Sequence, residues 1–261
     1  MSFADVESAN IVGYSTYTAQ KGFNLCAVNF KNIGEKEDFP IINLFPGVGK
    51  GVEMPGLNYR TGLATGADYM MVSTGPGSTD YNKYFLYYFS KGGNKNYKWL
   101  NADGGAVLDE NTTIKNGDAF WFVKQSEGSF DLPVSGEVEL AASKQVTIKK
   151  GFNLIGGFYP TGFAPNDAPY TSEYWKDTVG VKPQTGLATG ADYFMVSKGP
   201  GSTDYDKYFF YYFSKGGAKN YKWLNADGGS VVSGSILPPG RGMWFVRQGD
   251  TDITFDIKKQ F

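Results

Sequence analysis

Matched carboxylates are the first side chains in this sequence that could take part in a reaction. They form three pairs separated by 124 residues: Asp68 and Asp192, Asp80 and Asp204, and Asp103 and Asp227. Two carboxylates that flank a glycosidic bond can hydrolyse it. All of these residues stand close to Gly, Asn, Ser or Thr, where an Asp normally bonds the backbone of its own turn. We therefore favour turn-forming carboxylates over a calcium-binding loop, and a calcium-binding loop over catalysis.

Histidine is absent from the whole sequence of 261 residues. Its absence removes Ser-His-Asp catalysis, His-based zinc or iron sites and the usual proton shuttle near neutral pH. A glycine-rich segment at 75–78 lacks the lysine and the predicted helix of a phosphate-binding loop, so we interpret it as a turn. The sequence thus predicts a protein that is not an enzyme and that carries no cofactor and no metal.

Aromatic and polar residues that stand close together in the sequence form a better candidate binding site. Sugar-binding sites use flat rings and directional hydrogen-bonding groups, although aromatic side chains also fill β cores. Both interpretations stay open for each residue. The candidate ligand-binding residues are Asp80, Tyr81, Lys83, Tyr97, Trp99 and Asp103 in one copy, and Asp204, Tyr205, Lys207, Tyr221, Trp223 and Asp227 in the other.

These candidates lie inside a block that occurs twice, at 61–105 and 185–229, with 40 of 45 positions identical. Fainter matches outside the block, in the motifs GFNL and WFV, make each repeat a whole domain. The identical positions include polar residues such as Asn96 and Lys98, which packing alone does not explain. Either gene conversion has homogenised the two blocks, or both copies must present the same surface.

Short apolar or alternating segments recur between clusters of Gly, Pro, Asn and Asp, which is the pattern of an all-β sandwich or barrel. Residues 84–89 and 97–100 flank a glycine-rich turn and predict a β-hairpin. Its first strand is apolar or aromatic on both faces, as in a strand packed from two sides or one that leaves a face for a partner. We predict an all-β protein of two tandem, homologous sandwich-like or barrel-like domains.

The domain boundary is predicted near Gly136, which gives domains at 5–135 and 136–261. In each Trp-Phe-Val strand, the Trp and the Phe should face opposite ways, because neighbouring residues on a strand do so. The short connection implies domains in a fixed relation, for which a continuous sheet is one arrangement. Two alternating apolar sets would close the two domains: Phe130, Leu132 and Val134, and Ile253, Phe255 and Ile257.

Charge and composition narrow the classes of partner. With 25 basic and 26 acidic residues, the chain has no general field for nucleic acid or an anionic membrane. An aromatic content of 16% indicates a folded chain rather than a disordered one. The longest apolar run, at 84–89, is too short to span a bilayer as a helix. The one cysteine, Cys26, cannot form an intramolecular disulfide and is interpreted as a buried core residue.

The GFNL strand and a later strand of the form G-x-x-(F/M)-W-F-V resemble paired β-domains of exported bacterial surface proteins of uncharacterised function. These motifs begin at Gly22 and Gly117 in the first repeat, and at Gly151 and Gly240 in the second. The resemblance implies an extracellular or cell-surface setting and no particular activity. Residues 1–4, ending at Ala4, have small residues spaced as at the end of a signal peptide. They are either the remnant of a trimmed export signal or an ordinary cytoplasmic N-terminus.

Together these observations predict a non-enzymatic, exported structural or adhesive protein, such as a self-assembling subunit of a surface layer or filament. The aromatic hairpin or the C-terminal strand at 251–258 would contact another chain, because an unpaired strand edge readily accepts a neighbour. The alternative is a tandem carbohydrate-binding protein with one aromatic-lined site in each repeat. We expect self-association or a cell-surface or glycan partner, and we expect neither nucleic-acid binding nor a transmembrane segment.

Overall fold

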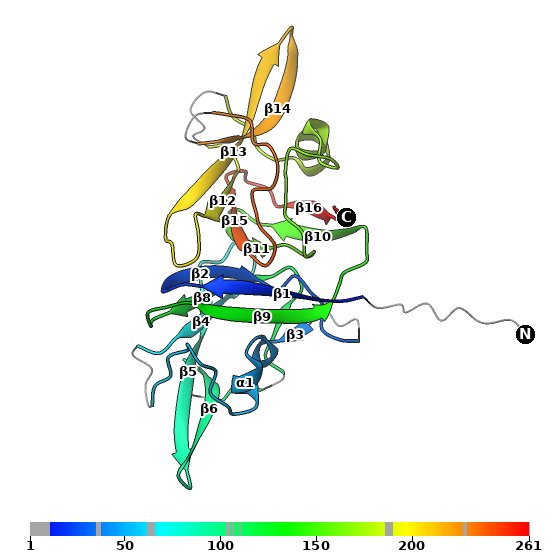
Figure 1. Cartoon of the computed structure of the whole chain (residues 1–261). Coiled ribbons are helices and arrows are strands. Elements are labelled where there is room, and N and C mark those ends of the chain that lie inside the picture. The colour runs from blue at the N-terminus through cyan, green and yellow to red at the C-terminus, as the bar shows by residue number, and fades with distance from the viewer. Residues whose placement is uncertain are drawn as a thin grey trace, which may run out of the picture.

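The computed structural model describes residues 11–34, 38–61, 66–102, 105, 107–109, 111–185, 190–226 and 229–260, and it shows an all-β protein of antiparallel sheets (Figure 1). The export-signal remnant predicted at 1–4 lies outside these residues. Within the described part of the chain, no helix has the length and apolar character needed to cross a membrane.

Repeat 1 forms a five-stranded antiparallel sheet in the order β2-β8-β4-β5-β6. The predicted hairpin is β5–β6, which projects at the lower end of the molecule in Figure 1. The strands are β2 (Gly22–Ala27), β4 (Tyr69–Ser73), β5 (Tyr81–Lys91), β6 (Asn94–Asn101) and β8 (Ala119–Lys124).

Repeat 2 forms a second sheet with the equivalent order, β11-β15-β12-β13-β14, and the equivalent register. Tyr69 pairs with Phe85 in the first sheet, and Tyr193 pairs with Phe209 in the second. The prediction that the two blocks share one fold and one strand pairing is therefore confirmed. The strands are β11 (Gly151–Gly156), β12 (Tyr193–Ser197), β13 (Tyr205–Lys215), β14 (Ala218–Asn225) and β15 (Gly242–Arg247).

Two-stranded ladders cover one face of each five-stranded sheet. The pair β1 (Val12–Ala19) and β9 (Phe130–Glu137) serves repeat 1, and β10 (Ser143–Ile148) and β16 (Ile253–Lys258) serve repeat 2. A third ladder joins β3 (Asp38–Pro40) to β7 (Thr113–Lys115). Both alternating sets predicted to close the domains are buried, at Phe130, Leu132 and Val134 and at Ile253, Phe255 and Ile257. The predicted boundary at 135/136 falls within the last residues of β9.

Short helices from diverged segments complete the two cores. In repeat 1 the 3₁₀ helix η1 (Ile41–Leu44) and the helix α1 (Pro46–Gly49) flank Phe45, whose ring lies 4.8 Å from that of Trp99. In repeat 2 the π-helix η2 (Tyr174–Val179) supplies Trp175, whose ring lies 5.3 Å from that of Trp223. Each repeat thus packs an aromatic ring from an unrelated segment against the same tryptophan of its hairpin.

The central strands β8 and β15 are buried on both faces. Phe122 and Phe245 point into the cores of repeat 1 and repeat 2, whereas Trp121 and Trp244 point into a third core between the repeats. This confirms the predicted division of the Trp-Phe-Val strands and shows that both members of each pair are buried.

The third core, which we call the joint, holds the two sheets face to face. Phe23 packs edge-on against Trp121 in repeat 1, at 5.8 Å, and Phe152 packs in the same way against Trp244 in repeat 2. Each sheet keeps its own strands, so the repeats are joined by packing rather than by one continuous sheet.

Backbone hydrogen bonds cross the joint in reciprocal positions. The Ala27 N–H donates to the Gly240 oxygen at 2.9 Å, and the Gly156 N–H donates to the Gly117 oxygen at 2.8 Å. Ala27 corresponds to Gly156 in the repeats, and Gly117 corresponds to Gly240. Such exchange of equivalent partners is the pattern of a twofold symmetric interface. The two repeats are therefore related by a pseudo-twofold axis through the joint.

Small residues allow the backbones to meet at this axis. A Cβ atom on Gly156 would lie 2.5 Å from the Cβ of Ala27, and one on Gly242 would lie 2.5 Å from the Cβ of Ala119. Gly242 corresponds to Ala119, so each contact pairs a residue with its own equivalent. One alanine and one glycine fit at each point, whereas two alanines would collide.

Replacing Gly242 with Ala should therefore destabilise the protein by about 1–3 kcal/mol, because the added methyl group has no room. Adding Ala119→Gly exchanges the two residues across the axis and should restore most of that stability. Urea unfolding of the wild type, both single variants and the double variant yields the coupling free energy. A double variant whose loss equals the sum of the single losses would contradict the close approach.

Candidate functional site

The predicted ligand-binding residues fall into different environments. Asp80 and Lys83 are exposed, as are Asp204 and Lys207 in the second repeat. The other predicted residues that the structure describes lie in the joint or in the cores of the repeats. Asp103 and Asp227 lie outside the described residues.

Trp99 and Trp223 are core residues, with exposed fractions of 1% and 0%. The ring of Trp223 lies 4.4 Å from that of Phe194 and 5.0 Å from that of Phe210. Among the described residues, neither indole N–H has a hydrogen-bond partner. Both tryptophans therefore hold their repeats together from within, and neither presents a face on which a ligand could stack.

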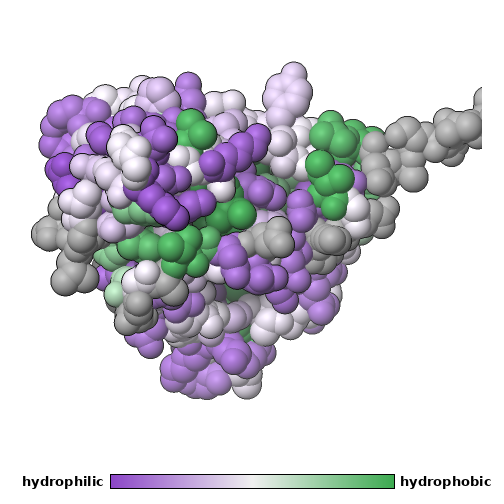
Figure 2. Space-filling model, turned by 90° about the horizontal axis from the view of Figure 1, so that it is seen from below, coloured by the Kyte–Doolittle hydropathy of each residue, from purple (hydrophilic) through white to green (hydrophobic). Residues whose placement is uncertain are grey.

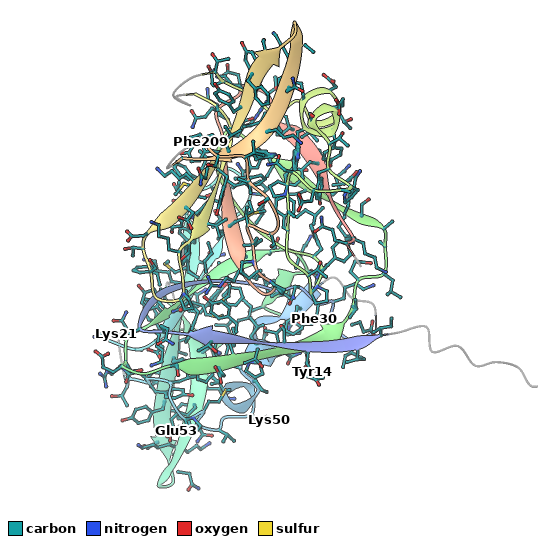
Figure 3. All side chains as sticks on the ribbon, turned by 45° about the horizontal axis from the view of Figure 1, so that its top comes forward. Tyr14, Lys21, Phe30, Lys50, Glu53 and Phe209 are labelled. Atoms are coloured by element: carbon teal, nitrogen blue, oxygen red, sulfur yellow. The ribbon has the colours of Figure 1, made fainter. Side chains whose placement is uncertain are left out.

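Tyr97 also faces the core, and its hydroxyl donates a hydrogen bond of 2.7 Å to Glu53 (Figure 3 labels Glu53 beside the hairpin). This hydrogen bond, together with burial, raises the pKa of Tyr97 to about 12. Tyr221, its equivalent, is half-buried and has the Lys176 ammonium 6.0 Å from its ring centre. The two tyrosines thus share a position and differ in their polar partner.

Tyr81 and Tyr205 lie at the border of the joint rather than beside Tyr97 and Tyr221. The Trp121 indole is hydrogen-bonded to the Tyr81 hydroxyl, and the Trp244 indole to the Tyr205 hydroxyl. Burial raises the pKa of both hydroxyls. These tyrosines therefore give the indoles of the joint the hydrogen-bond partner that buried polar groups need.

An accessible row of aromatic side chains runs along the other face of each hairpin. Three of its residues alternate along β5 or β13 and share a face because the side-chain period of a strand is two. The fourth is a tyrosine of the neighbouring strand β4 or β12, which pairs with the first of these three. All are half-buried except Phe213, which is 38% exposed. We define strip 1 as Tyr69, Phe85, Tyr87 and Phe89, and strip 2 as Tyr193, Phe209, Tyr211 and Phe213.

Each strip is an ordered surface with polar groups beside it. Rings of Tyr69 and Phe85 lie 5.3 Å apart, and those of Tyr193 and Phe209, the latter labelled in Figure 3, lie 4.9 Å apart. Lys98 stands directly across from Tyr87, in a pair that recurs at equivalent positions in repeat 2. The flat rings can stack on an apolar surface, and the ammonium group beside them can donate hydrogen bonds.

The sequence indicates the aromatic hairpin as a contact surface but does not indicate which face is open, because β5 carries aromatic residues on both faces. Trp99 stands opposite the buried Leu86, whereas Lys98 stands opposite Tyr87. Lysine rarely lies in a core, so its position opposite Tyr87 is the signal that this face is open. The surface seen from the repeat 1 end in Figure 2 is mostly hydrophilic, with apolar residues gathered in limited patches.

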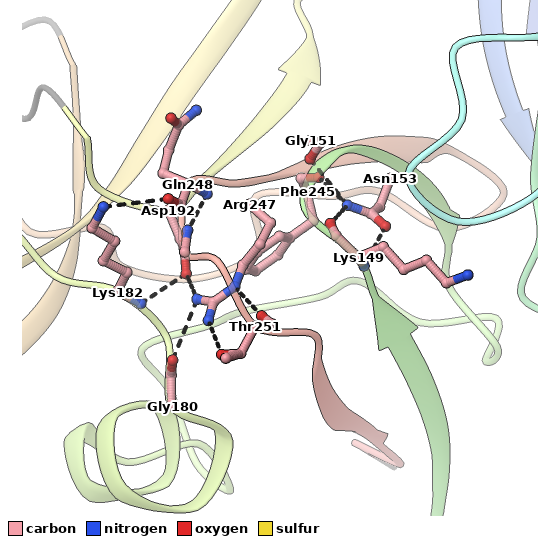
Figure 4. Close-up of polar contacts among 11 residues, drawn as sticks. Lys149, Gly151, Asn153, Gly180, Lys182, Asp192, Phe245, Arg247, Gln248 and Thr251 are labelled. Carbon is pink, nitrogen blue, oxygen red and sulfur yellow. Dashed lines mark hydrogen bonds and ion pairs between the residues drawn. The ribbon is translucent and has the colours of Figure 1, made fainter.

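Two of the matched carboxylates are buried anchors for loops. Asp192 forms a buried ion pair with Arg247 and accepts hydrogen bonds from the backbone N–H groups of Lys182, at 2.7 Å, and Gln248, at 2.6 Å (Figure 4). Its counterpart Asp68 accepts from the Asn58 and Gln125 N–H groups. These bonds tie distant segments together instead of capping a local turn.

The repeats differ in the cation beside this anchor. Lys124 takes the position of Arg247, and its ammonium donates to the Ser126 and Glu127 backbone oxygens. Burial raises the pKa of Asp68, and the backbone N–H donors and Lys124 act in the opposite direction. Within the part of the chain that the structure describes, no three His, Cys, Asp or Glu side chains gather in a group that could hold a metal ion.

Comparison of the chain with models of protein families, with curated proteins and with solved structures found no match. The resemblance to exported surface proteins stays an expectation. Function is therefore argued from the sites of this chain, because a fold alone does not determine activity.

Replacing Trp223 with Ala should lower the free energy of unfolding by about 3–5 kcal/mol, because the ring is fully buried. Replacing Phe213 with Ser should cost less than about 1 kcal/mol, because that ring is substantially exposed. Urea unfolding followed by circular dichroism measures both changes. Similar losses in the two variants would contradict the assignment of a core face and an open face.

Proposed function

We propose that this protein is a non-enzymatic, exported structural or adhesive protein that connects partners through its two aromatic strips. The strips are its binding surfaces, and the joint is the rigid connector between them. Catalysis has no part in this proposal.

The observation that supports it most directly is where the two blocks differ. Five positions distinguish them, and none belongs to a strip or to the lysines beside it. Met70 and Leu86, which are buried, are replaced by Phe194 and Phe210, so even the cores have changed. The remaining differences are Thr74 and Lys198, Asn82 and Asp206, and Asn94 and Ala218. Thr74, Asn82 and Asn94 are exposed, so the blocks have changed at exposed positions as well as at buried ones, while the strips have stayed identical. Shared use of one binding surface accounts for this conservation of the strips.

The arrangement of the hairpins supports a connecting role. The hairpins β5–β6 and β13–β14 project at opposite ends of the molecule (Figure 1). Because both ends carry the same strip, a contact of strip with strip leaves one strip free on each molecule. Such contacts continue into a chain of molecules instead of closing after two. A partner with a repeating surface would likewise be bound by both strips of one molecule, with a gain in avidity.

The faces of the hairpins, rather than their strand edges, are the surfaces proposed for contact. The edge of β6 is covered in part by its own chain, since Tyr97 N–H donates to the Gly51 oxygen and Leu108 N–H to the Trp99 oxygen. On β14 the Asn166 side chain bonds both the N–H and the oxygen of Trp223. The C-terminal strand is a weaker candidate, because β16 pairs with β10 and its Phe255 is buried.

Carbohydrate binding is the second candidate, and one observation favours it. Phe89 stands directly across from Asn96, and Tyr87 across from Lys98, so each strip combines stacking faces with amide and ammonium donors. A sugar ring needs both kinds of contact. The two functions differ in the partner and use the same residues.

Lysine in place of Phe89 or Phe213 should weaken association through that strip by about ten-fold or more, because an apolar contact would have to bury a charge. Sedimentation equilibrium over a range of concentrations measures the result. Wild-type protein should grow into long assemblies. Either single variant should stop at dimers through its remaining strip, and the double variant should stay monomeric.

Tyr14→Lys is the matched control, because Tyr14 is 87% exposed and lies on β1, outside both strips. It should assemble like the wild type. A wild-type protein that stays monomeric at every concentration would refute self-assembly. If it then bound glycans on an array, and the double variant did not, carbohydrate binding would replace assembly as the function of the strips.

A further inference from the structure

A cavity of about 490 Å³ lies beside the joint, on one side of the pseudo-twofold axis. Both repeats line it: Val72 and Asp118 belong to repeat 1, and Val146, Ile155 and Phe158 belong to repeat 2. Its volume falls within the range of small-molecule sites. The cavity is separate from the strips, so its use as a binding site is independent of the function proposed for them.

The equivalent place on the other side of the axis is occupied by two side chains of the protein. Tyr17 of β1 is buried, and the Arg241 guanidinium lies 5.4 Å from the centre of its ring. Cys26 pairs with Arg241 there in an isolated bridge between the repeats. A cation on an aromatic ring thus closes this side, in a contact that is favourable in itself.

The register identifies the corresponding residues of the cavity. Tyr17 pairs with Leu132 in one ladder, and Val146 pairs with Phe255, the equivalent of Leu132, in the other. Arg241 directly precedes Gly242, as Asp118 directly precedes Ala119. The cavity therefore has valine where the closed side has tyrosine, and a carboxylate where the closed side has a guanidinium.

The charges around the cavity favour a cation. The Asp118 carboxylate accepts a hydrogen bond of 3.1 Å from the Lys115 N–H and stays accessible to solvent. Lys115 stands opposite Asp38 in the β3–β7 ladder. The carboxylates of Asp38 and Asp118 therefore both lie near the one ammonium group of Lys115. Partial burial raises the pKa of Asp118, and Asp38 acts in the same direction, whereas Lys115 opposes them. A second cation at Asp118 would balance the local charge.

The wall of the cavity is apolar at the position that corresponds to the Tyr17 ring on the closed side. Val146 and the buried residues Ile155 and Phe158 provide this surface. Asn153 also lines the cavity, but its amide is engaged with the Gly151 and Phe245 oxygens (Figure 4). Lys115, Gln145 and Thr147 also line the cavity and are exposed. The feature that distinguishes the cavity from the closed side is the Asp118 carboxylate next to an apolar wall.

We propose that this cavity binds a small organic cation in which an amidinium, guanidinium or ammonium group is joined to a planar apolar ring. The cationic group would pair with Asp118, and the ring would lie against Val146. The ligand would reproduce with its own atoms the pair that Tyr17 and Arg241 form across the axis.

Isothermal titration of the full chain with benzamidine, a planar ring bearing an amidinium, tests this proposal. Saturable binding with one benzamidine per chain is expected. Benzamide, which has nearly the same shape and no charge, should bind at least ten-fold more weakly, and so should benzamidine to Asp118→Asn. Asp204→Asn, an exposed carboxylate outside the cavity, is the matched control and should bind like the wild type.

The double variant Val146→Tyr with Asp118→Arg should fill the cavity with the residues of the closed side and abolish binding. Its unfolding midpoint shows whether it folds, and the comparison of benzamidine with benzamide stands without it. Absence of saturation by benzamidine would overturn the proposal. Equal binding of benzamide, or undiminished binding of benzamidine to Asp118→Asn, would overturn it as well.

Discussion

The close approach of two backbones at the pseudo-twofold axis is the constraint on which the rest of this structure depends. Alanine faces glycine at two points, and reciprocal backbone hydrogen bonds cross the same region. Because backbone meets backbone, the sheets have little freedom to slide or separate. Trp121 and Trp244 fill the space around these contacts, and the hairpins are thereby directed to opposite ends.

Both faces of each central strand are buried, and the two faces have different roles. One face of β8 supports the joint, and the other supports a core whose remaining walls differ between repeats. Phe45 and Trp175 come from unrelated segments yet pack against equivalent tryptophans. Interior positions therefore tolerate change as long as volume is filled. Tyr69 and Tyr193 pack against the joint, but the outer rings of the strips, such as Phe213, are more accessible. Packing alone therefore does not explain why the strips are identical.

The sequence predicted the architecture and the aromatic hairpin as a contact surface, but not which face of the hairpin is accessible. Alternation in Phe130, Leu132 and Val134 and the adjacent Trp121 and Phe122 predicted strands whose burial the structure confirms. Trp99 stands among the ligand-binding candidates of the sequence, because a hairpin with aromatic residues on both faces carries no information about which face a core will cover. The contact of Arg241 with Tyr17 joins residues far apart in the sequence, and no local pattern reports it. Face-to-face packing was likewise invisible, since an apolar strand is the same in a sandwich and in a joint.

The fusion of two repeats in one chain removes a constraint that applies to every symmetric homodimer. In a homodimer each substitution occurs twice, so a pocket beside the axis can only be opened or closed on both sides together. Here Tyr17 and Arg241 close one side, while Val146 and Asp118 leave the other open. The two kinds of surface therefore differ in number: each repeat carries one strip, whereas the cavity of Val146 and Asp118 lies on one side of the axis. Because both repeats belong to one chain, a substitution on one side of the axis leaves the other side unchanged.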